Sequence, residues 1–133
     1  GVSMESFLGP LEARVLEAIW ASKKRPLTVR EVHELMGRDK SAYTTIMTTM
    51  NRLHDKGLLD REVKSGKGGL LYAYWPKMER DAFERNAIRE VLESLVDKFG
   101  EKVATCFVEQ MSSDKDMLAR LKTELKKVEE RQR

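Results

Sequence analysis

The sequence has little cysteine, histidine or proline, and it has no long apolar run. Its single cysteine, Cys106, has no partner for an internal disulfide, and two histidines leave too few soft ligands for a zinc site. No stretch of about 18 apolar residues exists, and residues 1–7 lack the basic and apolar parts of a secretory signal. The sequence therefore predicts no metal, no cofactor, no membrane insertion and a cytoplasmic location.

The sequence also lacks the residue sets on which most catalytic sites depend. Its scattered acids are not accompanied by a Ser/His/Asp set or a metal cluster. The glycine-rich stretch at residues 66–69 is not followed by the lysine, hydroxyl residue and helix of a nucleotide-binding loop. With 133 residues, the chain suits one domain, or a compact domain with a smaller extension. We therefore predict that the protein is not an enzyme.

Charge is abundant, and it is unevenly divided along the chain. Residues 1–78 carry 13 Lys and Arg against 9 Asp and Glu, whereas residues 79–133 carry 12 against 13. The overall net charge is +3. This mild positive excess in the first part fits an ordinary solvated surface, and it also fits a nucleic-acid-binding face if the cations converge in space.

Two short helices are predicted near the start of the chain. Pro10 suits a first helical turn, where its missing N–H is harmless, and the following apolar period ends near Ser22. Thr28 and Glu31 have the spacing of a capping box, so a second helix is expected to begin there. We expect Gly37 to end it in the left-handed conformation. The expected apolar face of this second helix comprises Val32, Leu35 and Met36.

A third helix, from about residue 41 or 42 to residue 56, has an unusual polar face. Its apolar side carries Ile46, Met50 and Leu53. Threonine is a mediocre helix former, so its frequency here is not explained by helix propensity. The polar face is either a solvated surface or one that enters a DNA major groove. Its residues are Tyr43, Thr44, Thr45, Thr48, Asn51 and Arg52.

A β-hairpin is predicted after the third helix. Gly57 closes that helix, a strand follows over residues 58–63, and residues 64–69 form a glycine-rich loop with two lysines. Residues 70–75 are rich in aromatic and large apolar side chains and return as the second strand, which ends at Pro76. Three helices followed by a basic hairpin is the element order of a winged helix-turn-helix.

The pattern then changes to long amphipathic helices. An apolar stripe runs from Phe83 to Phe99 and stops at Gly100; a second helix continues it to Met111, and a third starts at Ser113. These helices would leave much apolar surface exposed in a monomer, so we expect a second copy to cover it; folding back onto the first domain is the alternative. The expected dimerisation residues are Ile88, Val91, Leu92, Leu95, Phe99, Phe107, Leu118, Leu121 and Leu125.

The predicted fold is therefore mainly α with a small β-hairpin. A winged helix-turn-helix domain at residues 4–78 is followed by a helical dimerisation domain at residues 79–133.

Several stretches together resemble one known family. They are LGPLE at residues 8–12 with IW at 19–20, TVREV at 28–32, AYTTIMT at 42–48, NRL at 51–53, KGLL at 56–59, YAYWP at 72–76, FG at 99–100 and VE at 108–109. In this order, and over nearly the whole chain, they resemble the penicillinase repressors of the BlaI, MecI and CopY type.

This resemblance implies a homodimeric transcriptional repressor that binds a palindromic double-stranded operator through its winged helix. By the same mapping, the reading helix would use Ala42, Tyr43, Thr44, Thr45, Thr48 and Arg52. Hydroxyls can bond phosphates or bases, and Arg52 is assigned to phosphate because base contacts usually come from the amino end of such a helix. On the wing, Arg61, Lys64 and Lys67 would hold backbone phosphates.

The resemblance also bears on how the repressor would be released from DNA. Copper-responsive relatives carry paired Cys-x-Cys motifs, and the lone Cys106 argues against that mechanism. In antibiotic-responsive relatives, a membrane sensor protease triggers cleavage between an asparagine and a phenylalanine. The matching bond here joins Cys106 and Phe107, so the asparagine is missing. A small core residue is the other interpretation of Cys106.

Two further functions stay open at this point. The chain could be a winged-helix module that binds a protein, which the moderate net charge favours. It could also be a DNA-binding regulator that responds to a small ligand held near Trp20, Trp75 and Phe83, although such aromatics are more often core residues.

Overall fold

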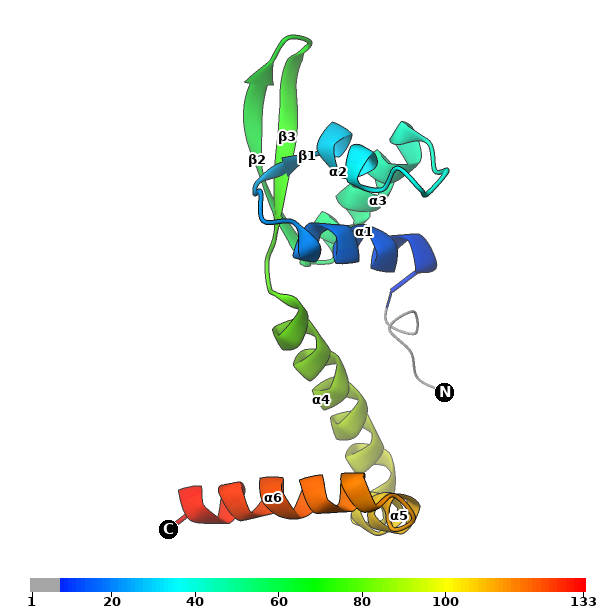
Figure 1. Ribbon diagram of the computed structural model, residues 1–133, viewed down its shortest axis with the longest axis vertical. Helices are drawn as coiled ribbons and strands as arrows, with labels where there is room; N and C mark the ends of the chain where they lie inside the picture. Colours follow the sequence, from blue (N-terminus) through cyan, green and yellow to red (C-terminus); the bar gives the residue numbers. More distant parts are fainter. Residues whose placement is uncertain (1–7) are drawn as a thin grey trace. The chain divides into compact units, whose positions relative to one another are not determined.

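The computed structural model describes residues 8–133, which form two compact units, residues 8–87 and 88–133 (Figure 1). The division falls inside helix α4 (Arg80–Phe99), so the first turns of α4 belong to the first unit. Residues 1–7, where the sequence predicts no secretory signal, lie outside the described residues, as does the predicted domain start at residue 4.

The first unit contains three helices and a three-stranded antiparallel sheet. In chain order these are α1 (Pro10–Ala21), β1 (Leu27–Thr28), α2 (Val29–Leu35), α3 (Tyr43–Asp55), β2 (Leu59–Gly66) and β3 (Gly69–Pro76), followed by the start of α4. The strand order is β1-β3-β2, so β3 is central. This arrangement confirms the predicted fold class, a winged helix-turn-helix followed by helices. The short strand β1, just before α2, was not predicted.

The core of the first unit lies where α1, α2 and α3 pack on one another and on the sheet. Helical spacing places Val15 and Ile19 on one face of α1, and Ile46 and Leu53 on one face of α3; all four are fully buried. Tyr74 of β3 is 1% exposed and completes the core from the sheet side. Burying each such side chain contributes roughly 1.5–3 kcal/mol, so this unit has its own source of stability.

The start of α2 follows the predicted capping box. The Thr28 hydroxyl accepts from the amide of Glu31 at 3.2 Å, and the Glu31 carboxylate accepts from the amide of Thr28 at 3.0 Å. Two predictions for the rest of this helix are wrong. Gly37 does not adopt a positive φ, and Leu35 is 55% exposed. The buried positions instead recur at intervals of three and four residues, at Val29, Val32 and Met36.

The hairpin is longer than the sequence indicates. Gly57 ends the α3 segment at φ +78°, as predicted, but the strands continue past residue 63 until Gly66 pairs with Gly69. Lys64 and Ser65 are therefore strand residues, not loop residues. The turn between the strands consists of Lys67 and Gly68. The next residue, Gly69, has φ +107°, a backbone conformation that favours glycine.

The second unit consists of the rest of α4, α5 (Lys102–Met111) and α6 (Lys115–Arg131). Gly100 ends α4 at φ +62°, as predicted. Asp114, one residue later than the predicted start, caps α6 by accepting from the amide of Met117 at 2.9 Å. No side chain of α5 or α6 is buried within the single chain. Cys106 is exposed, so its interpretation as a core residue is wrong for the isolated chain.

The predicted dimerisation residues carry the apolar surface of this unit. Phe99 is 61% exposed, whereas Val91, Leu118 and Leu121 are half-buried. An open apolar groove of about 450 Å³ runs between the end of α4 and α5, and Leu92, Leu95 and Phe107 contribute to its lining. The exposed members of the predicted set are Ile88, Leu92, Leu95, Phe99, Phe107 and Leu125.

Candidate nucleic-acid interface

The polar face of α3 is open to solvent. The Thr48 hydroxyl donates to the carbonyl of Thr44 at 3.0 Å, which leaves its oxygen able to accept a further bond. Thr49 makes the matching bond to Thr45 at 2.8 Å but is buried, so one of the four threonines belongs to the core. The exposed residues of this face and its cap are Ala42, Tyr43, Thr44, Thr45, Thr48, Asn51 and Arg52.

The loop before α3 is held by Asp39. Its carboxylate accepts from the amide of Ser41 at 2.9 Å and from its hydroxyl, and it forms an ion pair with Arg14 of α1 at 2.7 Å. The Ser41 hydroxyl and then the Arg14 guanidinium lower the pKa of Asp39 to about 2. His33 of α2 adds a hydrogen bond to the Ser41 carbonyl at 3.1 Å. These contacts fix where α3 begins relative to α1 and α2.

The other end of α3 is tied to α1 by charge. Lys56, the residue after α3, lies 2.8 Å from the Glu12 carboxylate, which also accepts from the amide of Gly9 at 3.1 Å. Burial raises the pKa of Glu12, but the hydrogen bonds from Lys56 and Gly9 outweigh it and lower the pKa overall. Both ends of the candidate reading helix are therefore anchored by polar contacts outside its exposed face.

Asn51 connects α3 to the hairpin. Its Oδ1 accepts from Arg61 Nη1 of β2 at 2.8 Å and from the Tyr74 hydroxyl of β3 at 3.1 Å. The Arg61 guanidinium also lies over the Tyr72 ring, with 4.0 Å from Cζ to the centroid. Arg61, predicted as a phosphate ligand, is thus already engaged inside the unit.

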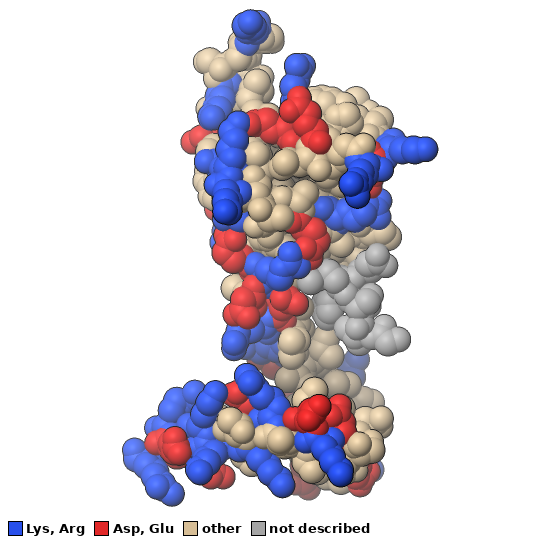
Figure 2. Space-filling view, in the orientation of Figure 1, with Lys and Arg blue, Asp and Glu red and all other residues tan. Residues whose placement is uncertain are grey.

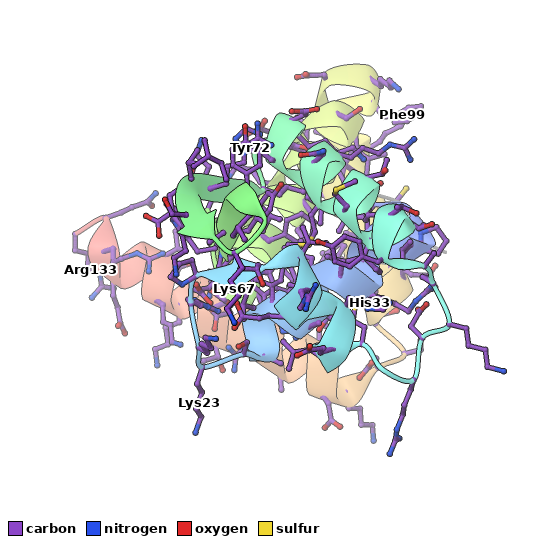
Figure 3. The ribbon with its side chains drawn as sticks, turned by 90° about the horizontal axis from the view of Figure 1, so that it is seen from above. Lys23, His33, Lys67, Tyr72, Phe99 and Arg133 are labelled. Atoms are coloured by element: carbon purple, nitrogen blue, oxygen red, sulfur yellow. The ribbon has the colours of Figure 1, made fainter. Side chains whose placement is uncertain are left out.

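The three predicted wing cations do not share one face of the hairpin. Arg61 and Lys64 are three residues apart on β2, so their side chains leave opposite faces of the strand, and Lys67 lies in the turn. Figure 2 shows Lys and Arg side chains at the free end of the hairpin. Figure 3 labels Lys67 of the turn, Tyr72 of β3 and His33 of α2 in a view from above.

A groove of about 570 Å³ lies between α3 and the hairpin. Its lining includes Arg30 of α2, Lys67 of the turn and three tyrosines, but no Asp or Glu. Tyr43 and Asn51 line it from α3. The groove therefore combines apolar and aromatic walls with positive charge and has no carboxylate in its lining.

Asn51 and Arg30 are among the residues of this interface that were not proposed as site residues from the sequence. Asn51 was recognised only as part of a polar face, because its contact with Arg61 and Tyr74 joins segments that are distant in the chain. Arg30 sits next to the capping box, and its position beside the groove follows from the packing of α2 on α3. The composition of the third helix was a signal for Asn51; no signal in the sequence singles out Arg30.

Two of the three aromatic side chains of the small-ligand alternative, Trp20 and Phe83, are packed in the first unit, and Trp75 is half-buried. The Trp20 and Phe83 rings lie 5.5 Å apart, and Trp20 Nε1 donates to the carbonyl of Met78 at 2.9 Å. Phe83 is buried. This contact holds the start of α4 against α1.

Over residues 8–133, we find no helix whose length and apolar character would allow it to cross a membrane. Nor does this part of the chain bring three His, Cys, Asp or Glu side chains together in a group able to hold a metal ion.

Comparisons with known proteins agree with the architecture. A model of the penicillinase repressor family matches residues 8–127. Over 121 residues, the chain is 35% identical to the transcriptional regulator BlaI of Mycobacterium tuberculosis, in strains CDC 1551 and H37Rv, covering 89% of this chain and 84% of the relative. A solved structure, a possible transcriptional regulator from Methanosarcina mazei Go1, shares the fold with a TM-score of 0.56 and 20% identity, over 74% of this chain and 79% of that one. The chain therefore belongs to the penicillinase repressor family of transcriptional regulators.

Proposed function

We propose that this chain is a transcriptional repressor that binds a palindromic operator as a homodimer. The observation that carries the proposal is the exposed face of α3, which offers hydroxyl, amide and guanidinium groups over residues 43–52 and lies beside a basic hairpin; its one carboxylate, Asp55, is the last residue of the helix. Such a face can donate and accept hydrogen bonds at base edges while avoiding repulsion from phosphates.

Within this proposal, the amino-terminal part of α3 reads bases. Ala42, Tyr43, Thr44, Thr45 and Thr48 supply a small apolar contact, hydroxyls and methyl groups that suit thymine methyls and base edges. Arg52 lies near the other end of α3 and is assigned to a phosphate.

The wing supplies affinity that does not depend on sequence. Lys64 and Lys67 are exposed and contact phosphates, each adding to the counterion-release term. Arg61 adds positive charge to the hairpin on the opposite face of β2 from Lys64, and its guanidinium is already bonded to Asn51.

The second unit provides the dimer contact in this proposal. Its exposed apolar side chains, including Phe99 and Leu125, become buried against a second copy. Two copies then present two reading helices, and we expect protection of two half-sites about 34–36 Å apart, or a multiple of that spacing.

In this proposal, an upstream signal releases the repressor from the operator in the cytoplasm. The candidate mechanism of release is cleavage of the chain by a membrane sensor protease, or under the control of such a protease. The side chains of Cys106 and Phe107 are exposed in the single chain, but their peptide bond lies inside α5. A protease therefore needs α5 to unwind locally before it can cut there.

The test is a gel-shift titration against the DNA upstream of the chain's own gene at several salt concentrations. The variant carries Thr45→Ala and Thr48→Ala. The control is Thr123→Ala in α6, which removes a matching hydroxyl bond to the carbonyl four residues earlier, at 3.1 Å. We expect the double variant to lose specific binding by roughly tenfold or more, and the control to bind like the wild type.

Weak, sequence-independent binding by the wild type and the double variant alike would contradict the proposal and favour a protein partner. Arg52→Ala and Lys64→Ala separate these functions further, because a protein-binding module should tolerate the loss of either cation, whereas a repressor should lose DNA affinity.

A further inference from the structure

The orientation of the Asn51 amide is fixed by its neighbours. A guanidinium can only donate hydrogen bonds, so the group that faces Arg61 Nη1 at 2.8 Å must be the amide oxygen, Oδ1. The Tyr74 hydroxyl, 3.1 Å from the same oxygen, then also donates to it. The oxygen of Asn51 is therefore committed to the hairpin, and its Nδ2 group, with two N–H donors, is directed away from both partners.

This orientation limits what Asn51 can recognise. A bidentate contact with adenine requires both the amide oxygen and the amide nitrogen, and here the oxygen is already used. Nδ2 can only donate, so a suitable ligand must present an acceptor. Phosphate oxygens are the most abundant acceptors on DNA.

The surroundings of Asn51 favour a phosphate. Asn51 lines the groove between α3 and the hairpin together with Arg30 and Lys67, and no carboxylate lines that groove. If α3 enters the major groove and the hairpin reaches the adjacent minor groove, the strand that separates those two grooves must pass between α3 and the hairpin. Asn51 also lies in the second half of α3, beyond the amino-terminal turns that contact bases in such helices.

We propose that Asn51 is a DNA-contact residue whose Nδ2 donates to a backbone phosphate in the groove between α3 and the hairpin, and that Arg61 is the positioning residue that orients it. The proposal rests on the proposed operator binding. It gives Arg61 a different role from the direct phosphate contact expected from the sequence.

The experiment is a phosphate-ethylation interference assay on the operator with the full chain and Asn51→Ala. For the wild type, ethylation of one particular phosphate in each half-site should block binding through Asn51; for Asn51→Ala, the same ethylation should no longer matter. We expect operator affinity to fall roughly threefold to tenfold, the range of one hydrogen bond. The salt dependence should not change, because a neutral amide releases no counterion, whereas Lys67→Ala should reduce its slope by about 0.9.

The control variant is Tyr74→Phe, which removes one hydrogen bond between α3 and β3 but leaves Arg61 to orient the amide. It should retain the wild-type interference pattern. The proposal is wrong if Tyr74→Phe loses ethylation interference at the same phosphate as Asn51→Ala, or if Asn51→Ala keeps the full wild-type interference pattern. In either case Asn51 only joins the helix to the hairpin.

Arg61→Met tests the positioning role. It removes the donor that orients Asn51 while keeping an apolar stem over Tyr72. If Arg61→Met loses ethylation interference at the same phosphate as Asn51→Ala, the result supports positioning. If it loses interference at a different phosphate and has a lower salt slope, Arg61 contacts DNA itself. The wild type and the Thr45→Ala, Thr48→Ala variant serve as references: if the wild type has no specific site, the proposed function fails, whereas specific binding with an Asn51-independent pattern overturns only this inference.

Discussion

In the first unit, the apolar faces of α1, α2 and α3 meet one another, and side chains such as Val15, Ile46 and Leu53 are fully buried. In the second unit, α5 and α6 have equally regular apolar periods, yet none of their side chains is buried in the single chain. The difference does not come from local sequence pattern, since both units show amphipathic spacing. It lies in what each face meets: the apolar faces of α1, α2 and α3 pack on one another, whereas those of α5 and α6 stay open in the single chain.

Hydrophobic spacing therefore predicts that a face will be covered, but not which chain covers it. The first unit can hold its shape through contacts within residues 8–87, including the contact between Trp20 and Phe83. The second unit leaves Phe99, Phe107 and Leu125 exposed. A protein that stays monomeric rarely leaves so many large apolar side chains of one unit uncovered, which is the physical argument for a second copy.

The largest effect should come from separating the two units. A chain that ends after Ala87 keeps the start of α4 packed on Trp20 and should unfold in a single cooperative transition. Without the second unit, it should bind operator roughly a hundredfold or more weakly and with about half the salt slope, because each molecule contacts only one half-site. A thermal melt measures the unfolding transition, and gel-shift titrations at several salt concentrations measure the operator affinity and the salt slope.

The matched control ends after Met78, which removes Phe83 and its contact with Trp20 as well. It should be less stable than the longer fragment. If the fragment that ends after Ala87 had the same operator affinity and salt slope as the full chain, the role assigned to the second unit would be contradicted.

The next effect compares one substitution in both units. Leu16 is 1% exposed, so Leu16→Ala should lower the free energy of unfolding by about 2–5 kcal/mol. Leu92 is exposed in the single chain, so Leu92→Ala should have little effect on a monomer. If a second copy covers Leu92, the loss of stability caused by Leu92→Ala should vary with protein concentration. Thermal melts at protein concentrations a hundredfold apart test this; a concentration-independent loss in Leu92→Ala would argue against a dimer contact there.

Much of the fold could be predicted because its signals are local. The capping box at Thr28, the proline at the start of α1 and the glycines at positions 57 and 100 each act through their own backbone, and each has the predicted role. One local signal failed, since Gly37 does not take the predicted positive φ, and another error arose where the outcome depends on packing. Leu35 has an apolar side chain, but its angular position on α2 turns it away from the core.

The candidate site was predictable in part for the same reason. The polar face of α3 follows from helical spacing alone, and its exposure agrees with the prediction. The contact of Asn51 with Arg61 and Tyr74 could not be predicted, because it depends on the register of β2 against β3 and on how α3 packs on the sheet. The assignment of its residues to bases and phosphates stays a prediction.

A smaller effect compares the helix caps of the two units. Thr28→Ala removes the side chain that accepts from Glu31 at the start of α2, and Asp114→Ala removes the equivalent group at α6. Each substitution should cost about 1 kcal/mol, measured by urea denaturation. Thr28→Ala should lower the stability of the first unit in the fragment and in the full chain alike, whereas a loss confined to the full chain would mean that the first unit depends on the second.

The smallest effect concerns two carboxylates, one in each unit. The pKa of Asp39 is about 2, through the Ser41 hydroxyl and then Arg14, which is 25 residues away. The pKa of Glu124 is lowered mainly by its hydrogen bond from Lys127 in the same helix. Because both folded pKa values lie below the unfolded ones, each group's contribution to stability is present above about pH 4 and is lost as the pH falls.

Neither pKa shift should change when the units are separated, because the groups that lower each pKa lie in the same unit as the carboxylate. In the fragment that ends after Ala87, an NMR titration should still place the midpoint of Asp39 near 2, and Ser41→Ala should raise that midpoint more than Arg14→Ala does. The lowering of the Glu124 pKa needs only a helical α6, so it should survive substitutions that break the dimer but become smaller in Lys127→Ala, where only Arg120 and Arg131 still lower it. If the Asp39 midpoint in the fragment lay near its unfolded value, the loop before α3 would not be fixed by the first unit alone. The first unit would then also depend on contacts from outside it, although less than the second unit does.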